Sequence, residues 1–223
     1  MTEASYPNLF LVGAPKCGTT SLFDWFAQHD DVFCGYRKEP ATLVGTREHP
    51  LPAAMPYDDY LEMYAARTNE RYALDASTRY LAAPQAPANI AALADDPKII
   101  MVLRSPVDAI YSMYFHYIVQ EKESHDRFED ALRADDAAPT DAHAAREPYR
   151  ETFTYVPQVT RYFETFGREN VRCILFDELK ADDTAVLRDL CDWLDIRYPG
   201  TGLAQSNTAR AVRFKTLNLS LIH

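Results

Sequence analysis

The stretch "FLVGAPKCGTTSLFDWF" (residues 10–26) joins an apolar run, a tight loop and the beginning of a helix. The run "FLVG" is typical of a short buried strand. Leu22 and Phe26 follow at helical spacing, so a helix is expected to begin near Gly18 or Thr19. Free N–H groups gather where a strand turns into a helix, and together with the helix dipole they favour an anion such as a phosphate. The stretch therefore predicts an α/β protein with a phosphate-binding loop.

The loop "APKCGTTS" also carries side chains that suit an anion. Gly18 lets the backbone approach a ligand closely. Thr19, Thr20 and Ser21 supply hydroxyl donors, and Lys16 lies where it can reach the next anionic group. The alternative interpretation is an ordinary turn between a strand and a helix, capped by a hydroxyl.

The order of lysine and glycine separates this loop from the usual nucleoside-triphosphate loop, G-x-x-x-x-G-K-[ST]. Gly13 and Gly18 have the right separation, but Thr19 occupies the lysine position. The strongest strand, at residues 99–103, is followed by Arg104 and not by an acid that would help to hold magnesium. Both departures disfavour a kinase or NTPase, and no metal site is expected.

A second motif, "LRSPVDAIYSMY" (residues 103–114), repeats the strand–turn–helix arrangement. Its strand delivers Arg104 at the carboxyl end, where ligands of open α/β sheets bind. Pro106 begins a helix, and Ser112 lies about two turns into it. A forked cation and a hydroxyl together predict a grip for a second phosphate. Alone, Arg104 would more simply pair with a nearby acid.

Strands alternate with helices along the chain, which predicts one doubly wound parallel sheet in a single domain over residues 1–223. Residues 134–150, rich in alanine, proline and charge, are expected to form a mobile insertion, and residues 205–223 form a basic tail. Strands are expected at residues 8–13, 31–33, 71–76, 98–104 and 170–179, and helices at 19–29, 57–67, 84–96, 106–121, 155–167 and 183–196.

Composition sets broader limits on function. The net charge of −10 disfavours diffuse affinity for nucleic acid or an anionic membrane. The four cysteines show no zinc spacing, and Cys173 and Cys191 are expected to be buried. The N-terminus lacks a signal-peptide pattern and no window reaches a transmembrane length, so a cytoplasmic location is expected.

The two motifs together resemble those of the PAPS-dependent sulfotransferases. "PKCGTTSL" is similar to the family's 5′-phosphosulfate loop, and "VLRSPVDAIYSMY" is similar to its 3′-phosphate motif. "KEP" at residues 38–40 and "DASTRYL" at residues 75–81 resemble the carbohydrate branch, which includes heparan sulfate enzymes and many bacterial relatives. The resemblance extends over about residues 8–196 and implies a P-loop-like α/β fold with a central parallel sheet.

The resemblance also implies the donor, 3′-phosphoadenosine 5′-phosphosulfate (PAPS), and the product adenosine 3′,5′-bisphosphate (PAP). Within the motifs, the lysine is implied to contact the bridging oxygen and the sulfuryl group. The loop is implied to cradle the 5′-phosphate, and the arginine and serine to grip the 3′-phosphate. The residues so implied in donor binding are Lys16, Cys17, Gly18, Thr19, Thr20, Ser21, Arg104 and Ser112.

The proton of the acceptor must be removed by a general base. Glu39 matches the acidic residue taken as the base in the heparan sulfate branch. His116, one helical turn beyond the serine of the second motif, is the alternative base, and His49 is a weaker one. Asp75 and Ser77 are expected to line the acceptor cleft.

The family often closes its nucleotide site with a basic segment near the C-terminus, so the resemblance implies this role for Arg210, Arg213 and Lys215. The ending "LNLSLIH" stops in an apolar helical pattern, which suggests a shortened chain. The acidic balance favours a small-molecule, lipid or simple sugar acceptor over a long polyanionic glycan. Two alternatives stay open, a P-loop kinase or NTPase and a non-catalytic nucleotide-binding relative.

Overall fold

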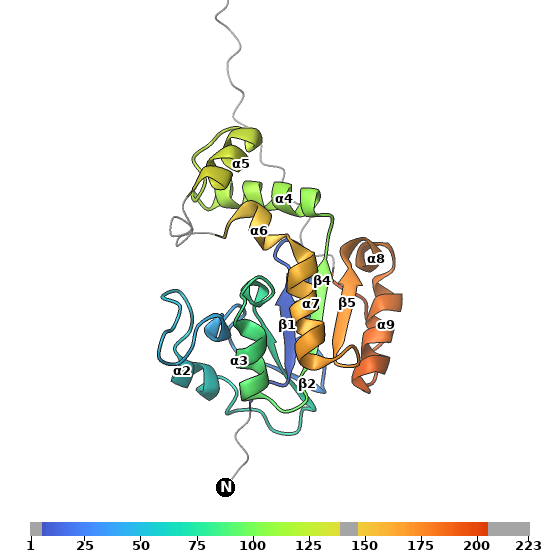
Figure 1. Ribbon diagram of the computed structural model, residues 1–223. Helices are drawn as coiled ribbons and strands as arrows, with labels where there is room; N and C mark the ends of the chain where they lie inside the picture. The colour runs from blue at the N-terminus through green and yellow to red at the C-terminus, as the bar shows by residue number, and fades with distance from the viewer. Residues whose placement is uncertain (1–5, 139–146, 205–223) are drawn as a thin grey trace, which may run out of the picture.

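A parallel sheet forms the centre of the protein in the computed structural model, which describes residues 6–138 and 147–204 (Figure 1). Its spatial order is β2-β3-β1-β4-β5, and each neighbouring pair runs parallel. The strands of the described ranges are β1 (Leu9–Gly13), β2 (Val32–Cys34), β3 (Tyr72–Ala76), β4 (Lys98–Leu103) and β5 (Val171–Leu175). The predicted P-loop-like α/β fold is confirmed.

Strands β1 and β3 are buried along their whole length, because helices cover both faces of the sheet. The chain leaves β1 toward β2 and β3 on one side, and later continues from β4 to β5 on the other. Strands β1 and β4 are hydrogen-bonded neighbours, so the sheet reverses its direction of growth between them. Open α/β sheets bind ligands at such a switch point, and both sequence motifs follow these two strands.

Right-handed crossovers place the β1–β2 helix and the β3–β4 helix on opposite faces of the sheet. Figure 1 shows α3 and α7 side by side on one face. On the other, Trp25 of α1 donates a hydrogen bond to the carbonyl of Thr201, beyond α9. The helices are α1 (Thr19–Phe26), α2 (Tyr57–Glu62), α3 (Ala86–Leu93), α4 (Pro106–Val119), α5 (Phe128–Ala137), α6 (Tyr149–Thr152), α7 (Tyr155–Phe166), α8 (Phe176–Ala181) and α9 (Asp183–Leu194), with 3-10 turns η1 (Thr42–Val44) and η2 (Thr78–Tyr80).

Several predicted boundaries were wrong. The strand expected at residues 170–179 ends at Leu175, and α8 begins at once, with two acids in its first turn as a helix start prefers. Helix α2 is shorter than the helix expected at residues 57–67. Cys173 is exposed, because it lies on an edge strand that is only partly covered.

The segment at residues 134–150 does not have the expected boundaries. Its first residues continue α5, where the buried Asp135 accepts a hydrogen bond from the backbone N–H of Tyr149 at 2.8 Å. Tyr149 is itself fully buried at the start of α6. Both ends of the segment therefore belong to the packed structure, and residues 139–146 lie outside the described ranges.

Helices α4, α5 and α6 gather at one end of the molecule, beyond the carboxyl ends of the central strands (Figure 1). Within the described ranges, no helix is long and apolar enough to cross a membrane. The same ranges contain no cluster of three or more His, Cys, Asp or Glu side chains that could hold a metal ion.

Candidate functional site

A cleft of about 590 Å³ opens at the carboxyl ends of the strands and is called here the main cleft. It brings together groups from the two sequence motifs and from the segment around Glu39, which are far apart in the chain. The residues that line it are Pro15, Lys16, Gly18, Thr19, Thr20, Ser21, Lys38, Glu39, Thr78, Arg104, Ser112, His116 and Phe176.

The loop between β1 and α1 forms one wall of the main cleft. Gly18, at the N-cap position of α1, has φ 82°, a conformation that glycine adopts at little cost. A Cβ atom at this position would come within 3.0 Å of the Phe176 ring, so the close approach also requires glycine. Without a side-chain cap, the N–H groups of the first helical turn are directed to the position where helix termini bind anions.

Two cations lie next to each other in this cleft. The Arg104 guanidinium donates a long hydrogen bond of 3.4 Å to the Lys16 carbonyl and lies 4.9 Å from the centre of the Phe176 ring. Burial and then the nearby Arg104 charge hold the pKa of the Lys16 ammonium below its usual value. Within residues 6–138 and 147–204, neither side chain forms an ion pair with an acid. The pair is therefore electrostatically suited to an anionic ligand.

Helix α4 contributes Ser112 and His116, one turn apart, to the same cleft. The His116 side chain is partly buried, and no hydrogen bond joins its ring to another described residue. Burial, followed by the charges of Lys16 and Lys122, lowers its pKa below the usual 6.5. The imidazole is thus neutral at pH 7 and able to accept a proton.

Glu39 lies opposite α4 and is held in place by three donors. Its Oε1 accepts hydrogen bonds from the Lys38 ammonium at 2.8 Å and the Thr78 hydroxyl at 3.1 Å. Its Oε2 accepts one from the Thr78 backbone N–H at 2.8 Å. The backbones of Glu39 and Lys16 both have positive φ, 59° and 63°. Such strain persists only where the surroundings enforce it, and it is commonly found at functional sites.

The expectation that Asp75 and Ser77 line the cleft is wrong, because both side chains are buried below it. Asp75 accepts hydrogen bonds at 2.8 Å from the hydroxyls of Ser77, Tyr60 and Tyr80. Ser77 Oγ in turn accepts one from the Ala41 backbone N–H at 3.0 Å. Burial raises the pKa of Asp75 to about 6, although the three hydroxyls oppose that shift. This buried network supports the segment that carries Glu39.

The Cys17 side chain does not line the main cleft. Its side chain is fully buried, and its Sγ contacts the Pro15 carbonyl at 3.3 Å and the Tyr155 hydroxyl at 3.8 Å. Burial raises the pKa of the thiol to about 11. Only its backbone therefore remains for a ligand in the cleft. Arg210, Arg213 and Lys215, expected to close the site, lie outside the described residues.

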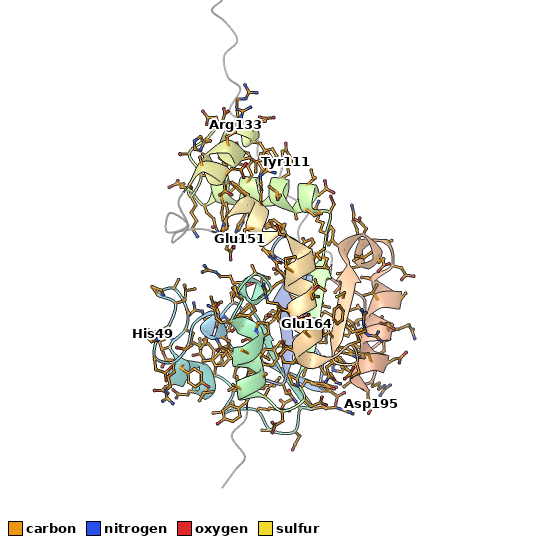
Figure 2. All side chains as sticks on the ribbon, in the orientation of Figure 1. His49, Tyr111, Arg133, Glu151, Glu164 and Asp195 are labelled. Atoms are coloured by element: carbon orange, nitrogen blue, oxygen red, sulfur yellow. The ribbon has the colours of Figure 1, made fainter. Side chains whose placement is uncertain are left out.

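The structure also differs from the sequence-based expectations for His49 and for three residues that line the main cleft. His49 is exposed, and Figure 2 shows it at the periphery, far from α4. Lys38, Thr78 and Phe176 line the main cleft but were not predicted as site residues. Lys38 and Thr78 belong to the quoted "KEP" and "DASTRYL" motifs, so the sequence could have indicated them as site residues. Phe176 was not considered, because it was assigned to the strand expected at residues 170–179, whereas it begins α8.

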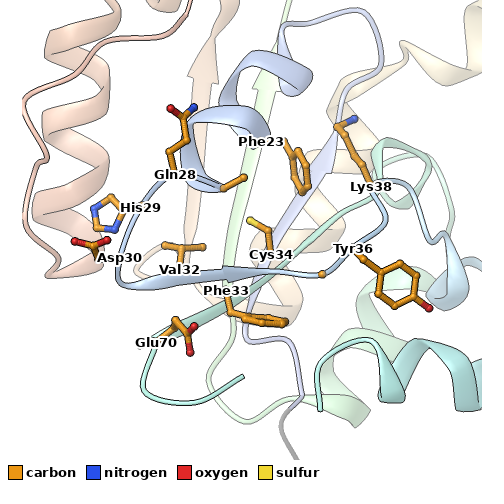
Figure 3. Close-up of a pocket in the computed structure, with 12 residues that line it drawn as sticks. Phe23, Gln28, His29, Asp30, Val32, Phe33, Cys34, Tyr36, Lys38 and Glu70 are labelled. Carbon is orange, nitrogen blue, oxygen red and sulfur yellow. The ribbon is translucent and has the colours of Figure 1, made fainter. Parts of the chain in front are cut away.

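A second hollow of about 540 Å³ lies beside β2 (Figure 3). Lys38 and Tyr36 point to opposite sides of the segment that borders it. The histidine at its edge, His29, already contacts the Arg197 carbonyl at 2.9 Å. The hollow contains neither Lys16 nor Arg104, so we assign the chemistry to the main cleft.

The switch point, with its two strand–turn–helix loops and its adjacent cations, has the arrangement with which open α/β proteins bind phosphorylated ligands at the carboxyl ends of parallel strands. The chain belongs to the sulfotransferase domain family, because residues 6–212 match the family described as "Sulfotransferase domain". The predicted resemblance is thereby confirmed, and the kinase alternative receives no support.

Individual relatives agree with this assignment. The crystal structure of a sulfotransferase from Alicyclobacillus acidocaldarius superposes with a TM-score of 0.79 and 31% identity, covering 91% of this chain and 85% of that one. Mouse sulfotransferase SULT7A1, solved in complex with PAP, shares the fold, with a TM-score of 0.58, 18% identity, and 87% and 60% of the two chains covered.

Among curated proteins, the bifunctional heparan sulfate N-deacetylase/N-sulfotransferase 1 of Caenorhabditis elegans is 24% identical over 204 residues. The match covers 87% of this chain but 23% of the relative, so the chain spans less than a quarter of that protein's length.

Proposed function

We propose that this chain transfers a sulfuryl group from PAPS to a hydroxyl or amine of an acceptor. The single observation that carries the proposal is the adjacent pair of cations, Lys16 and Arg104, without an acidic partner among the described residues. Two partly buried like charges repel each other and are stabilised when an anionic ligand binds between them.

The residues of the cleft fit such a donor. The loop with Gly18 and the first turn of α1 would hold the 5′-phosphate, and Arg104 with Ser112 would hold the 3′-phosphate. An adjoining pocket shares Gly18, Ser21 and Phe176 with the cleft and adds apolar Leu179 and Leu203, which suits an aromatic base. When bound, the donor supplies the sulfuryl group and leaves as a nucleotide phosphate.

The chain's own groups would then act on charge and on the acceptor proton. Lys16 would stabilise the negative charge that grows on the departing phosphate oxygen, a role in which a fixed donor is effective. Glu39 would take the acceptor's proton, since its carboxylate is held toward the cleft by Thr78. His116 is the alternative base, being neutral and without a hydrogen-bond partner among the described residues.

The first experiment compares PAP with adenosine 5′-monophosphate, which lacks only the 3′-phosphate, by calorimetry. The wild type should prefer PAP by about 100-fold or more, and the double variant Arg104→Gln/Ser112→Ala should lose most of that preference. Binding of adenosine 5′-monophosphate itself should change little, which controls for folding.

The second experiment measures radiolabelled sulfate transfer from PAPS into a panel of alcohols, amines and sugars. Transfer above background is the expected result. Magnesium-dependent ATP binding with no affinity for PAP would instead identify a kinase or NTPase. PAP binding with no transfer to any acceptor would identify a non-catalytic relative.

A further inference from the structure

The main cleft continues into two further cavities on the acceptor side. A side cavity of about 380 Å³ shares Lys16, Glu39, Thr78 and His116 with the main cleft. The residues that it adds are Ala41, Ala53, Arg79, Tyr117, Gln120, Lys122 and Glu147. A third cavity, called here the apolar pocket, has about 190 Å³ and shares Thr78, Arg79 and Glu147 with the side cavity. The three cavities are thus contiguous.

The apolar pocket lies between η1, η2 and α6, and its wall is mainly carbon. Val44, Ala82, Ala83 and Pro148 supply its apolar side chains, and the other lining residues are Thr78, Arg79, Glu147, Glu151 and Thr152. Glu151, labelled on α6 in Figure 2, is exposed to solvent. An apolar cavity of about 150 Å³ suffices to bind benzene, so the pocket has room for one aromatic ring or a short branched alkyl group.

We infer that this pocket binds the apolar end of the acceptor, and that the acceptor is a small alcohol whose apolar end is an uncharged aryl or branched alkyl group. The inference rests on the proposed function and deepens it. The acceptor hydroxyl lies near Glu39, and the apolar end passes the Arg79–Glu147 pair into the pocket.

The charges around the apolar pocket disfavour an acidic group at the apolar end of the acceptor. Arg79 Nε lies 3.0 Å from Glu147 Oε1, and the Tyr117 hydroxyl donates a hydrogen bond of 3.3 Å to the same carboxylate. Glu39 is paired with Lys38. The side cavity also contains Lys16 and Lys122, but neither lysine lines the apolar pocket. An acidic group inside that pocket would lie near the Glu147 and Glu151 carboxylates and against alanine and proline side chains, which is unfavourable.

Sugars are disfavoured for a related reason. Each hydroxyl of a sugar that enters the apolar pocket loses hydrogen bonds to water, and the alanine and proline side chains return none. The polar groups of the lining are largely engaged already, since Arg79 pairs with Glu147 and the Thr78 and Thr152 hydroxyls donate to Glu39 and to the Pro148 carbonyl. Transfer of an aromatic ring or an alkyl group into the pocket is favourable, because its apolar surface leaves water.

Three alcohols test this inference as sulfate acceptors: 3-phenylpropan-1-ol, its 4-carboxyphenyl analogue and D-glucose. The wild type should show a KM for 3-phenylpropan-1-ol at least about tenfold below the KM of the other two. An equal or lower KM for the carboxylate analogue or for glucose overturns the inference, while any transfer from PAPS leaves the proposed function standing.

The matched variants are Ala82→Leu, which fills the apolar pocket, and Ala91→Leu, an exposed position on α3 outside all three cavities. Ala82→Leu should raise the KM for 3-phenylpropan-1-ol about tenfold or more, and Ala91→Leu should leave it unchanged. PAP affinity should stay within about twofold of the wild type in both, which shows that the variants are folded.

A binding measurement makes the test independent of turnover. In ligand-observed NMR titrations of the PAP-loaded protein, 3-phenylpropan-1-ol should bind saturably to the wild type and more weakly to Ala82→Leu. Equal binding to both overturns the inference alone. Absence of PAP binding overturns it together with the proposed function.

Discussion

The two halves of the proposed site, one for the donor and one for the acceptor, are built in different ways. The donor half consists of two loops, each continuous in sequence, that follow the neighbouring strands β1 and β4. The acceptor half is assembled from the Glu39 segment, η2 and the beginning of α6, which lie far apart in the chain.

The two halves differ in the interactions that hold their residues in place. Backbone geometry defines the donor half, through the positive φ of Gly18 and the N–H groups at the start of α1. Side-chain contacts define the acceptor half, through the Thr78–Glu39 hydrogen bonds and the Arg79–Glu147 pair. Substitutions in the donor half should therefore act on chemistry and donor binding, whereas those in the acceptor half should also act on stability and pH dependence.

Replacing Lys16 should have the largest effect. In Lys16→Ala, kcat should fall by about 10²–10³, because a donor that stabilises charge in the transition state is lost. PAP affinity should fall less, by about tenfold at most, since the loop N–H groups and Arg104 remain. Steady-state kinetics measure kcat, and calorimetry measures PAP affinity. Lys98→Ala, at the opposite end of β4, is the control for loss of a positive charge and should retain turnover.

Glu39→Gln comes next, with an expected loss of about 10²-fold in kcat and nearly unchanged PAP affinity. Glutamine preserves the shape of the side chain, so the loss reports on the proton acceptor and not on packing. His116→Gln should cost less. A larger loss of kcat in His116→Gln than in Glu39→Gln would indicate that His116, and not Glu39, is the general base.

The pH profile separates these bases further. The pKa of His116 lies below its usual 6.5, so a histidine base would lose activity only as the pH falls below about 6.5. If Glu39 is the base, His116→Gln should leave the acid limb of the wild-type profile unchanged. Its disappearance in His116→Gln would identify the histidine instead.

Asp75→Asn tests the buried support of the acceptor half. The pKa of Asp75 is about 6 in the folded protein and near 3.8 when exposed, so the folded state binds the extra proton between these values. Protonation of Asp75 therefore stabilises the folded state. This stabilisation is fully present below about pH 4 and is lost as the pH rises through 6. Relative to Asp75→Asn, the wild type should therefore gain roughly 2–3 kcal/mol between pH 7 and pH 4. Urea denaturation at both pH values measures this, and a constant difference would contradict it.

Cys17→Ala should have the smallest effect on the donor. PAP affinity should stay within about twofold, because the thiol is buried away from the cleft, while the free energy of unfolding falls by about 1 kcal/mol. A tenfold loss of PAP affinity without unfolding would show that the side chain contributes to the donor site after all.

The donor half was largely predictable because its determinants are local. Spacing alone marked Lys16, Gly18, Arg104 and Ser112, and the structure gathers all four in one cleft. The burial of the Cys17 side chain was not predictable, because adjacent loop residues point to opposite sides and sequence spacing does not say which side is buried. Phe176 was missed because a short apolar run does not distinguish the end of a strand from the start of a helix.

The acceptor half was less accessible from the sequence. Asp75 and Ser77 were expected at the surface of the cleft, but their polarity is used in a buried network below it. Polar residues after a strand can face a ligand or satisfy one another, and only the positions of Tyr60 and Tyr80 decide between the two.

The sequence by itself determined the parallel α/β fold, the loop between β1 and α1 and the family, because strand–turn–helix units with their glycine and lysine are short-range features. Only the tertiary structure decided that Thr78 holds Glu39, that Arg79 pairs with Glu147, and that an apolar pocket lies beyond them. These contacts join residues about 40 to 70 positions apart, and such pairings depend on how the elements pack around the sheet.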